Sequence, residues 1–176
     1  SDPSDPDVVA ATIIDGEITR IGIVCFSEET SETIISGFTI VNGNSYTWQG
    51  GGGVENSNSS PTLKFCTFTS HSNDFSAMYN YNSSPILENC TFTNNLSCGV
   101  YNAWNSSPTL TNCTFVSNGG WASVYGGMLN KYSSSPTLTN CTFENNIGVG
   151  MANEDSSPTL NNCTFKKNVE DGHSGM

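Results

Sequence analysis

The chain has 176 residues, of which 35% are hydrophobic and only 12% are charged, and its formal net charge is −11. With five basic residues, so acidic a chain repels phosphate groups, and we expect neither nucleic acid nor an anionic membrane surface as a partner. No apolar stretch is long enough to span a membrane, so we expect no direct membrane insertion.

The N-terminal part divides into a polar stretch and three apolar runs. Residues 1–10 are rich in Asp and Pro, and we interpret them as an acidic linker or a mature N-terminus. The runs at 11–14, 21–26 and 33–41 are short, rich in β-branched residues and bounded by Gly, Asp, Glu or Ser. This pattern is typical of β-strands.

One phrase then recurs along the chain, as in Ser-Ser-Pro-Thr-Leu-Thr-Asn-Cys-Thr-Phe at 106–115. Further copies occupy 59–68, 83–92, 134–143 and 156–165. A degenerate copy at 33–40 carries Phe38 in place of the Cys. A repeat of about two dozen residues indicates a solenoid in which each unit stacks on its neighbours.

The repeat contains two sets of inward-facing positions. Cys and Phe lie two residues apart, so they share one face of a strand while the Thr between them faces outward. These structural ladders are Cys66, Cys90, Cys113, Cys141 and Cys163, and Phe68, Phe92, Phe115, Phe143 and Phe165. Leu in the preceding strand and Met or Val in the first strand complete each coil.

These rows predict an all-β fold, a right-handed parallel β-helix with three short strands per coil and about six coils, spanning 11–168. We interpret 169–176 as the start of a further coil, cut short. The Asn before each Cys (Asn89, Asn112, Asn140, Asn162) is expected at a bend, in left-handed geometry, with its amide bonded along the stack.

The cysteine row does not suggest a metal site. Zinc needs several Cys or His side chains converging on one point, whereas these cysteines occur once per coil and in line. We expect stacked, buried, reduced thiols that behave as small hydrophobes. No metal or other cofactor is therefore predicted.

The repeats resemble the parallel β-helix repeats of bacterial secreted and surface proteins, including the polymorphic outer-membrane autotransporter group. Two short signatures carry the likeness. Phe-x-x-Asn occurs at 92–95, 115–118, 143–146 and 165–168, and a looser Gly-Gly-Ala-Ile occurs at 52–54 and 126–128. The resemblance covers about 33–168 and implies the fold. Proteins with such repeats include adhesins, structural spikes, polysaccharide lyases and scaffolds.

An enzyme of this fold would be expected to use clustered carboxylates. The resemblance implies several Asp for calcium and a basic residue in lyases, or two or three neighbouring Asp in hydrolases. No two Asp occupy one aligned position on adjacent repeats here, and the single arginine, Arg20, lies near the N-terminal end. His71 is interpreted as a solvated loop residue. We predict no catalytic residues and no enzyme activity.

Aromatic residues form the leading candidate contact surface. Tyr79 and Tyr101 share a repeat position, and Tyr81, Trp104 and Tyr132 follow in the next turn. We expect these five to be exposed, because Tyr and Trp are favoured where sugars or proteins bind. The longer segment 119–125 is expected to border this surface.

Threonine rows offer a weaker alternative. One row contains Thr67, Thr91, Thr114, Thr142 and Thr164, and a flat Thr array could order water, as in an ice-binding solenoid. The neighbouring outward row changes from Thr69 and Thr93 to Glu144 and Lys166, which an ice-binding face should not tolerate. Thr is also simply a good exposed strand residue.

Two classes of function fit these sequence features best. The first is a non-catalytic scaffold, extracellular or at the cell surface, that serves as an adhesin or stalk segment or stacks end to end with copies of itself. The second is a carbohydrate-binding or lyase-like module that uses the aromatic residues to contact a glycan. Self-association and a cell-surface glycan or protein are therefore the expected partners.

Overall fold

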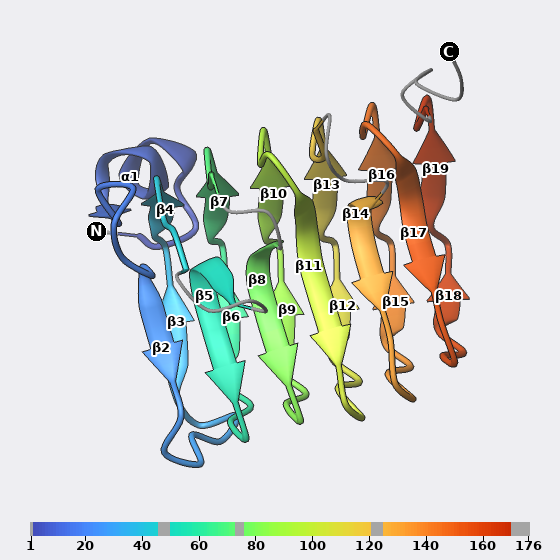
Figure 1. Ribbon diagram of the computed structural model, residues 1–176. Helices are drawn as coiled ribbons and strands as arrows, with labels where there is room; N and C mark the ends of the chain where they lie inside the picture. Colours follow the sequence, from blue (N-terminus) through green and yellow to red (C-terminus); the bar gives the residue numbers. More distant parts are fainter. Residues whose placement is uncertain (1, 46–49, 73–75, 121–124, 170–176) are drawn as a thin grey trace.

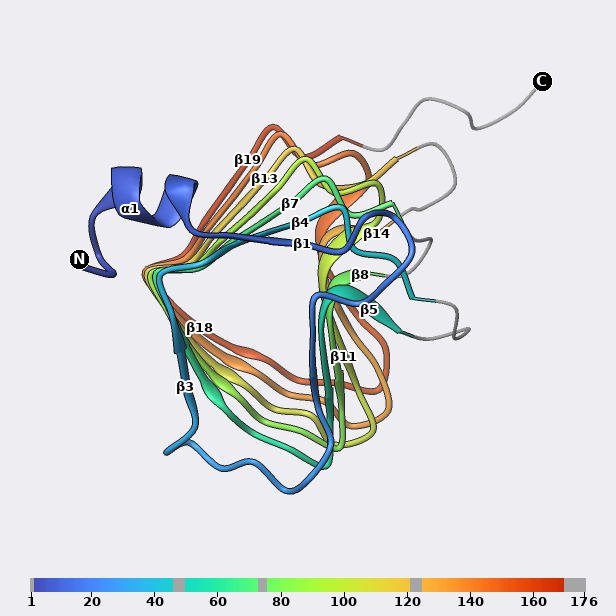
Figure 2. The same ribbon diagram turned by 90° about the vertical axis from the view of Figure 1, so that its left-hand side faces the viewer.

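The computed structural model describes residues 2–45, 50–72, 76–120 and 125–169. The chain winds as a parallel β-helix of six coils, with one strand of every coil in each of three sheets (Figure 1). Viewed along the axis, the sheets enclose one continuous core (Figure 2). The predicted fold class is confirmed.

Each sheet is named here after a side chain that it contributes. The Phe sheet contains β1 (Ile13–Asp15), β4 (Thr39–Val41), β7 (Thr67–Thr69), β10 (Thr91–Thr93), β13 (Thr114–Val116), β16 (Thr142–Glu144) and β19 (Thr164–Lys166). The Asn sheet contains β2 (Ile23–Cys25), β5 (Gly51–Ser57), β8 (Ser76–Tyr81), β11 (Cys98–Ala103), β14 (Tyr125–Asn130) and β17 (Val149–Asn153). The Leu sheet contains β3 (Ile34–Ser36), β6 (Thr62–Lys64), β9 (Ile86–Glu88), β12 (Thr109–Thr111), β15 (Thr137–Thr139) and β18 (Thr159–Asn161).

The core is built from the predicted rows in strict register. Phe92 pairs with Phe68 on one side and Phe115 on the other, and the stacked rings of this row lie 4.4–4.9 Å apart at nearly parallel angles. The Leu row and the Val/Met row are buried with them. Because three-residue strands bury little within one coil, stability depends on contacts between coils.

Turns between the Leu and Phe sheets have the geometry that the repeat predicts. Asn89, Asn112, Asn140 and Asn162 all have φ of 51–55°. Their exposed amides bond along the stack, with Nδ2 to Oδ1 distances of 2.8–3.2 Å. Asn tolerates this left-handed conformation because its short polar side chain bonds locally. The predicted ladder is confirmed.

Two further Asn ladders, which were not predicted, are buried except for their last members, Asn153 and Asn168. One runs through the Asn sheet, and each Nδ2 donates to the next Oδ1 at 2.8 Å. Its members are Asn56, Asn80, Asn102, Asn130 and Asn153. The other contains Asn95, Asn118, Asn146 and Asn168, whose amides bond one another and also donate to the carbonyl of a Phe in the preceding coil. The buried amide nitrogens are tolerated here because the next coil supplies an acceptor for each.

The N-terminal region is more ordered than a linker. Residues 6–11 form helix α1 (Pro6–Ala11), which begins after the N-cap Asp5 with a Pro in its first turn. Val9 is buried, and its carbonyl accepts a hydrogen bond from Thr39 Oγ1 at 2.8 Å. The predicted strand at 33–41 is two strands, because the chain bends at Gly37, where φ is 77°. Residues 170–176 lie outside the described residues.

Candidate functional site

The predicted aromatic residues gather along the outer side of the Asn sheet. Tyr79 pairs with Tyr101 in register, and their ring centroids lie 5.2 Å apart. Tyr81 ends β8 and lies beside Trp104, which begins the turn of the next coil, at 6.3 Å. Tyr132 follows on the next coil, 4.7 Å from Trp104. The structure therefore brings all five residues together.

The prediction that all five are exposed is wrong for two of them. Tyr79 and Tyr101 are only 4% and 6% exposed, because they pack with Cys98, Ala103 and Leu129 in a second hydrophobic cluster outside the sheet. Burial raises the pKa of both hydroxyls, so they remain neutral at physiological pH. These two tyrosines stabilise the outer surface of the fold and offer no open ring face.

The remaining three residues, Tyr81, Trp104 and Tyr132, form an exposed row that we call the aromatic ladder. Their exposed fractions are 38%, 47% and 43%. Trp104 and Tyr132 are stacked with an interplanar angle of 26°, so each ring covers a face of the other. A sugar stacks on an open aromatic face, and the stacking takes up one face of Trp104 and one face of Tyr132.

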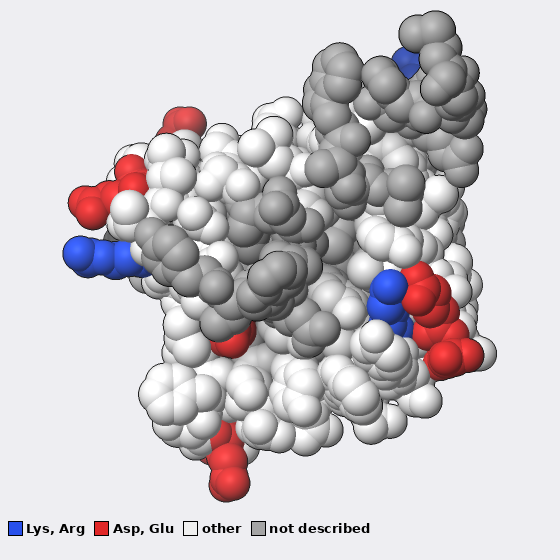
Figure 3. Space-filling model, viewed as in Figure 1, with Lys and Arg blue, Asp and Glu red and all other residues white. Residues whose placement is uncertain are grey.

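A charged cluster borders the last rung of the ladder. Lys131 Nζ lies 2.9 Å from Glu154 Oε1, and the Tyr125 hydroxyl donates to the same oxygen at 2.9 Å. The Lys131 ammonium also lies 5.3 Å from the centre of the Tyr125 ring. These bonds, from Lys131 first and Tyr125 second, lower the pKa of the Glu154 carboxyl. Figure 3 shows lysine and acidic side chains side by side on this face.

This charged cluster was not predicted, although its signal is present in the sequence. Lys131 follows Asn130, and Glu154 follows Asn153, so the two charges occupy one repeat position on neighbouring coils. The Lys64–Glu88 pair at 2.9 Å and the Lys166–Glu144 pair at 3.1 Å arise from register in the same way. Glu88, Glu144 and Glu154 thus form ion pairs that join neighbouring coils.

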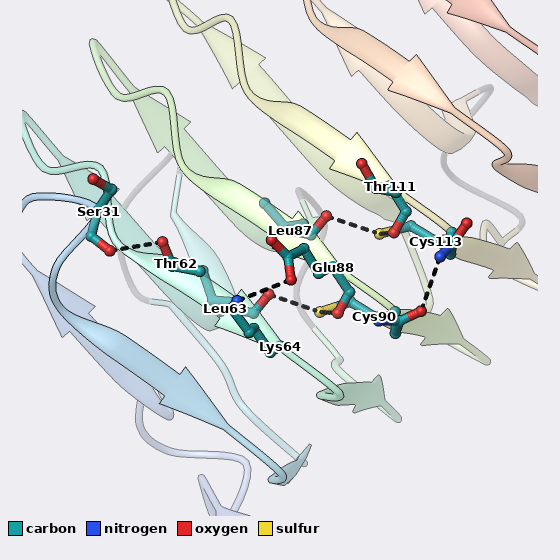
Figure 4. A network of polar contacts seen from close by, with 11 residues as sticks. Ser31, Thr62, Leu63, Lys64, Leu87, Glu88, Cys90, Thr111 and Cys113 are labelled. Atoms are coloured by element: carbon teal, nitrogen blue, oxygen red, sulfur yellow. Dashed lines mark hydrogen bonds and ion pairs between the residues drawn. The ribbon is translucent and has the colours of Figure 1, made fainter. Parts of the chain in front are cut away.

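The cysteine row lies at the corner between the Leu and Phe sheets. Cys66, Cys90, Cys113 and Cys141 are buried, and every cysteine in the chain is a free thiol. Each ladder sulfur lies near a carbonyl oxygen in the preceding coil, as Cys90 does to Leu63 at 3.5 Å and Cys113 to Leu87 at 3.6 Å (Figure 4). The thiols therefore act as small core residues with weak hydrogen bonds.

The interpretation of His71 as a solvated loop residue is wrong. Its side chain is 1% exposed and takes the place of Asn in the buried ladder, one coil before Asn95. Nδ1 accepts a hydrogen bond from the Gly43 backbone N–H at 2.9 Å, and burial lowers the pKa of His71 to about 4. Its ring fits beside Gly43 and Gly53, where an added Cβ would lie within 2.9 Å of a ring nitrogen.

The threonine row of the Phe sheet is continuous and in register, and Thr39 extends it. The Lys166–Glu144 ion pair lies on the same face. Fixed charges disturb an ordered water layer, so this face is a poor match to the ice-binding alternative.

Within the described ranges, no three His, Cys, Asp or Glu side chains converge as a metal site. No helix among the described residues is long and apolar enough to cross a membrane. Of the segment 119–125, which was expected to border the aromatic residues, 121–124 lie outside the described part.

Comparison with known proteins supplies the family. The model of the right-handed β-helix region matches residues 7–165, which is most of the chain and every strand up to β18. No curated protein and no solved structure matches the chain. The match does not single out the autotransporter group, so that finer resemblance stays a prediction. By its register, its rows and this match, the chain belongs to the family of right-handed β-helix proteins.

Proposed function

We propose that the chain is a non-catalytic scaffold, a stiff segment of an extracellular or cell-surface protein that holds other parts at a set distance. The observation that carries the proposal is the unbroken contact between coils. Phe rings, Asn amides and backbone groups of each coil bond or stack with those of the next. A solenoid joined in this way resists bending, because bending would break several rows at once.

The use of polar side chains also supports this role. Asn side chains that could bind a ligand are occupied in ladders, and turn serines accept backbone N–H bonds from the preceding coil at 3.0–3.1 Å. Three lysines of the repeats, Lys64, Lys131 and Lys166, pair with glutamates across coils. The Ser-, Thr- and Asn-rich surface, poor in lysine, fits an environment outside the cell.

The second candidate is a carbohydrate-binding module that uses the aromatic ladder. The exposure of Tyr81, Trp104 and Tyr132 favours it. The mutual stacking of Trp104 and Tyr132 argues against it, because one face of each ring is already covered.

Duplication of coils tests the proposal that the chain is a stiff scaffold. Two extra copies of 83–105, inserted after residue 105, should lengthen the rod by roughly 10 Å, because each coil adds about 4.8 Å. Small-angle X-ray scattering measures this length. The matched control carries an insert of equal length and composition with the order scrambled, which should loop out without lengthening the rod. Equal length for both inserts would contradict the proposal.

Assays of the purified chain on a panel of polysaccharides distinguish the scaffold from an enzyme and from a carbohydrate-binding module. Release of new reducing ends or unsaturated sugars by the purified chain would show catalysis and overturn the proposal. Retention on an immobilised glycan that is lost in Trp104→Ala would favour the binding module. Tyr101→Ala is not a suitable probe, because Tyr101 is buried.

A further inference from the structure

The cysteines of the repeats form a continuous line of thiols, which we call the thiol row. Its members are Cys66, Cys90, Cys113, Cys141 and Cys163. The first four are at most 1% exposed, and all five are free thiols. They pack in the same hydrophobic cluster as the Leu and Phe rows. The dry core therefore contains one sulfur ligand for a soft metal ion in each of these coils.

The sulfur atoms repeat at the spacing of the coils. Every Sγ in the row lies 3.5–3.8 Å from a carbonyl oxygen of the preceding coil and 3.3–3.5 Å from the carbonyl oxygen two residues before it. Figure 4 shows two of the contacts with the preceding coil. The strands on either side of the row pair in register. Because each sulfur has the same surroundings, neighbouring sulfurs are separated by one coil step, about 4.8 Å.

This spacing fits a metal ion held in line between two sulfurs. A metal–thiolate bond is about 2.3 Å long, so two bonds end to end span about 4.6 Å. The Phe rings of the same coils step by 4.4–4.9 Å, so the coils need not shift to admit the ion. A tetrahedral zinc ion would draw its sulfurs to about 3.8 Å and needs two further ligands. Among the described residues, no group of three His, Cys, Asp or Glu converges to supply them.

Charge selects among the soft ions that accept two ligands in line. When a divalent ion binds, two thiols release two protons to solvent and two metal–sulfur bonds form, so the buried pair stays neutral. A monovalent ion between two thiolates leaves one negative charge in the core, which a low-dielectric environment disfavours. Mercuric ion is divalent and soft and accepts two sulfurs in line, so it matches the spacing, the ligand type and the charge.

We propose that the thiol row binds a soft divalent metal ion, with mercuric ion as the example, in line between the thiolates of neighbouring coils. Five thiols make two such pairs and leave one over, so the chain should hold two ions. This site does not depend on the scaffold role, because it requires only that neighbouring coils stack in register.

The metal content of the refolded chain tests the site. The chain is refolded from urea with mercuric chloride, so that burial does not limit access to the thiols. Excess glutathione then removes ions that are held by a single thiol, and native mass spectrometry counts the ions that remain. We expect two mercuric ions per chain and no zinc after the same treatment with zinc chloride. X-ray absorption should show two sulfur ligands at about 2.3 Å and no others. Loss of all mercuric ion to glutathione, or equal retention of zinc, would overturn the proposal.

Single substitutions test the pairing of neighbours, because they remove different numbers of adjacent pairs. Cys90→Ser leaves Cys66 without a neighbouring thiol and should lower the content from two ions to one. Cys113→Ser leaves one intact pair on each side of the gap and should retain two. Cys98→Ser, at a buried thiol outside the row, is the matched control and should also retain two.

Circular dichroism establishes that each variant is folded, and Cys90→Ala and Cys113→Ala replace any serine variant that unfolds. The same loss of one ion from the variants at 90 and 113 would contradict binding between neighbours. A loss in the Cys98→Ser control would mean that the ions bind outside the thiol row, and would also overturn the proposal.

Discussion

Replacement of His71 by Asn should remove an acid sensitivity that the structure builds into the buried ladder. His71 Nδ1 accepts from Gly43 N–H in the way that Asn95 Oδ1 accepts from His71 N–H. An Asn at 71 can keep this acceptor, and it does not titrate. The substitution therefore separates the hydrogen bond from the proton equilibrium.

The magnitude follows from the depressed pKa of His71, about 4 against an ordinary 6.5. Between these values the unfolded chain takes up a proton and the folded chain does not, so the stability contributed by the neutral ring is present above pH 6.5 and is lost as the pH falls toward 4. A difference of about two and a half pKa units corresponds to about 3 kcal/mol at pH 4. The smaller Asn side chain should cost on the order of 1 kcal/mol at every pH through the space it leaves.

Urea unfolding at pH 7, 6, 5 and 4 measures the effect. The free energy of unfolding of the natural chain should fall relative to that of His71→Asn by about 3 kcal/mol from pH 7 to pH 4. Carboxylates titrate in both chains and cancel in the difference. A difference that is the same at pH 7 and pH 4 would refute the reasoning, because it would mean that His71 ionises freely in the folded state.

Three further substitutions, two of them with a matched control substitution, test the packing by chemical denaturation. Asn118→Ala leaves buried ladder amides without partners and should lower the free energy of unfolding by about 2–4 kcal/mol. Asn112→Ala, in the exposed ladder, should lower it by less than about 1 kcal/mol. Equal losses of stability would contradict the role of burial. Gly127→Ala should cost more than about 2 kcal/mol, because its Cβ meets a carbonyl of the next coil and a Phe ring. Ala77→Gly, at the equivalent position, should cost about 1 kcal/mol, and a tolerated Gly127→Ala would show that the coils can shift. Phe115→Ala should cost about 3–5 kcal/mol, and a loss below about 1 kcal/mol would mean that the Phe stack is not needed.

The repeat alone determined the fold and most of the core. Cys and Phe two residues apart can share a face only in a strand, and a fixed period places like residues on like residues when coils stack. This is why the Phe stack, the thiol row and the bend at Asn112 follow from the sequence. The ion pairs Lys64–Glu88 and Lys131–Glu154 were equally accessible to this reasoning, because register alone brings their charges together.

The tertiary structure decided which outward or loop residues are covered. Period two shows that Tyr79 and Tyr101 leave the core, but not that other side chains bury them on the outer face. His71 looked like a loop residue because its buried position depends on glycines in two other segments of the chain. Likewise, the sequence places Asn112 and Asn118 only six residues apart, yet one ladder is exposed and the other buried. Facing direction is a local property of the strand, whereas burial depends on what the rest of the chain packs above it.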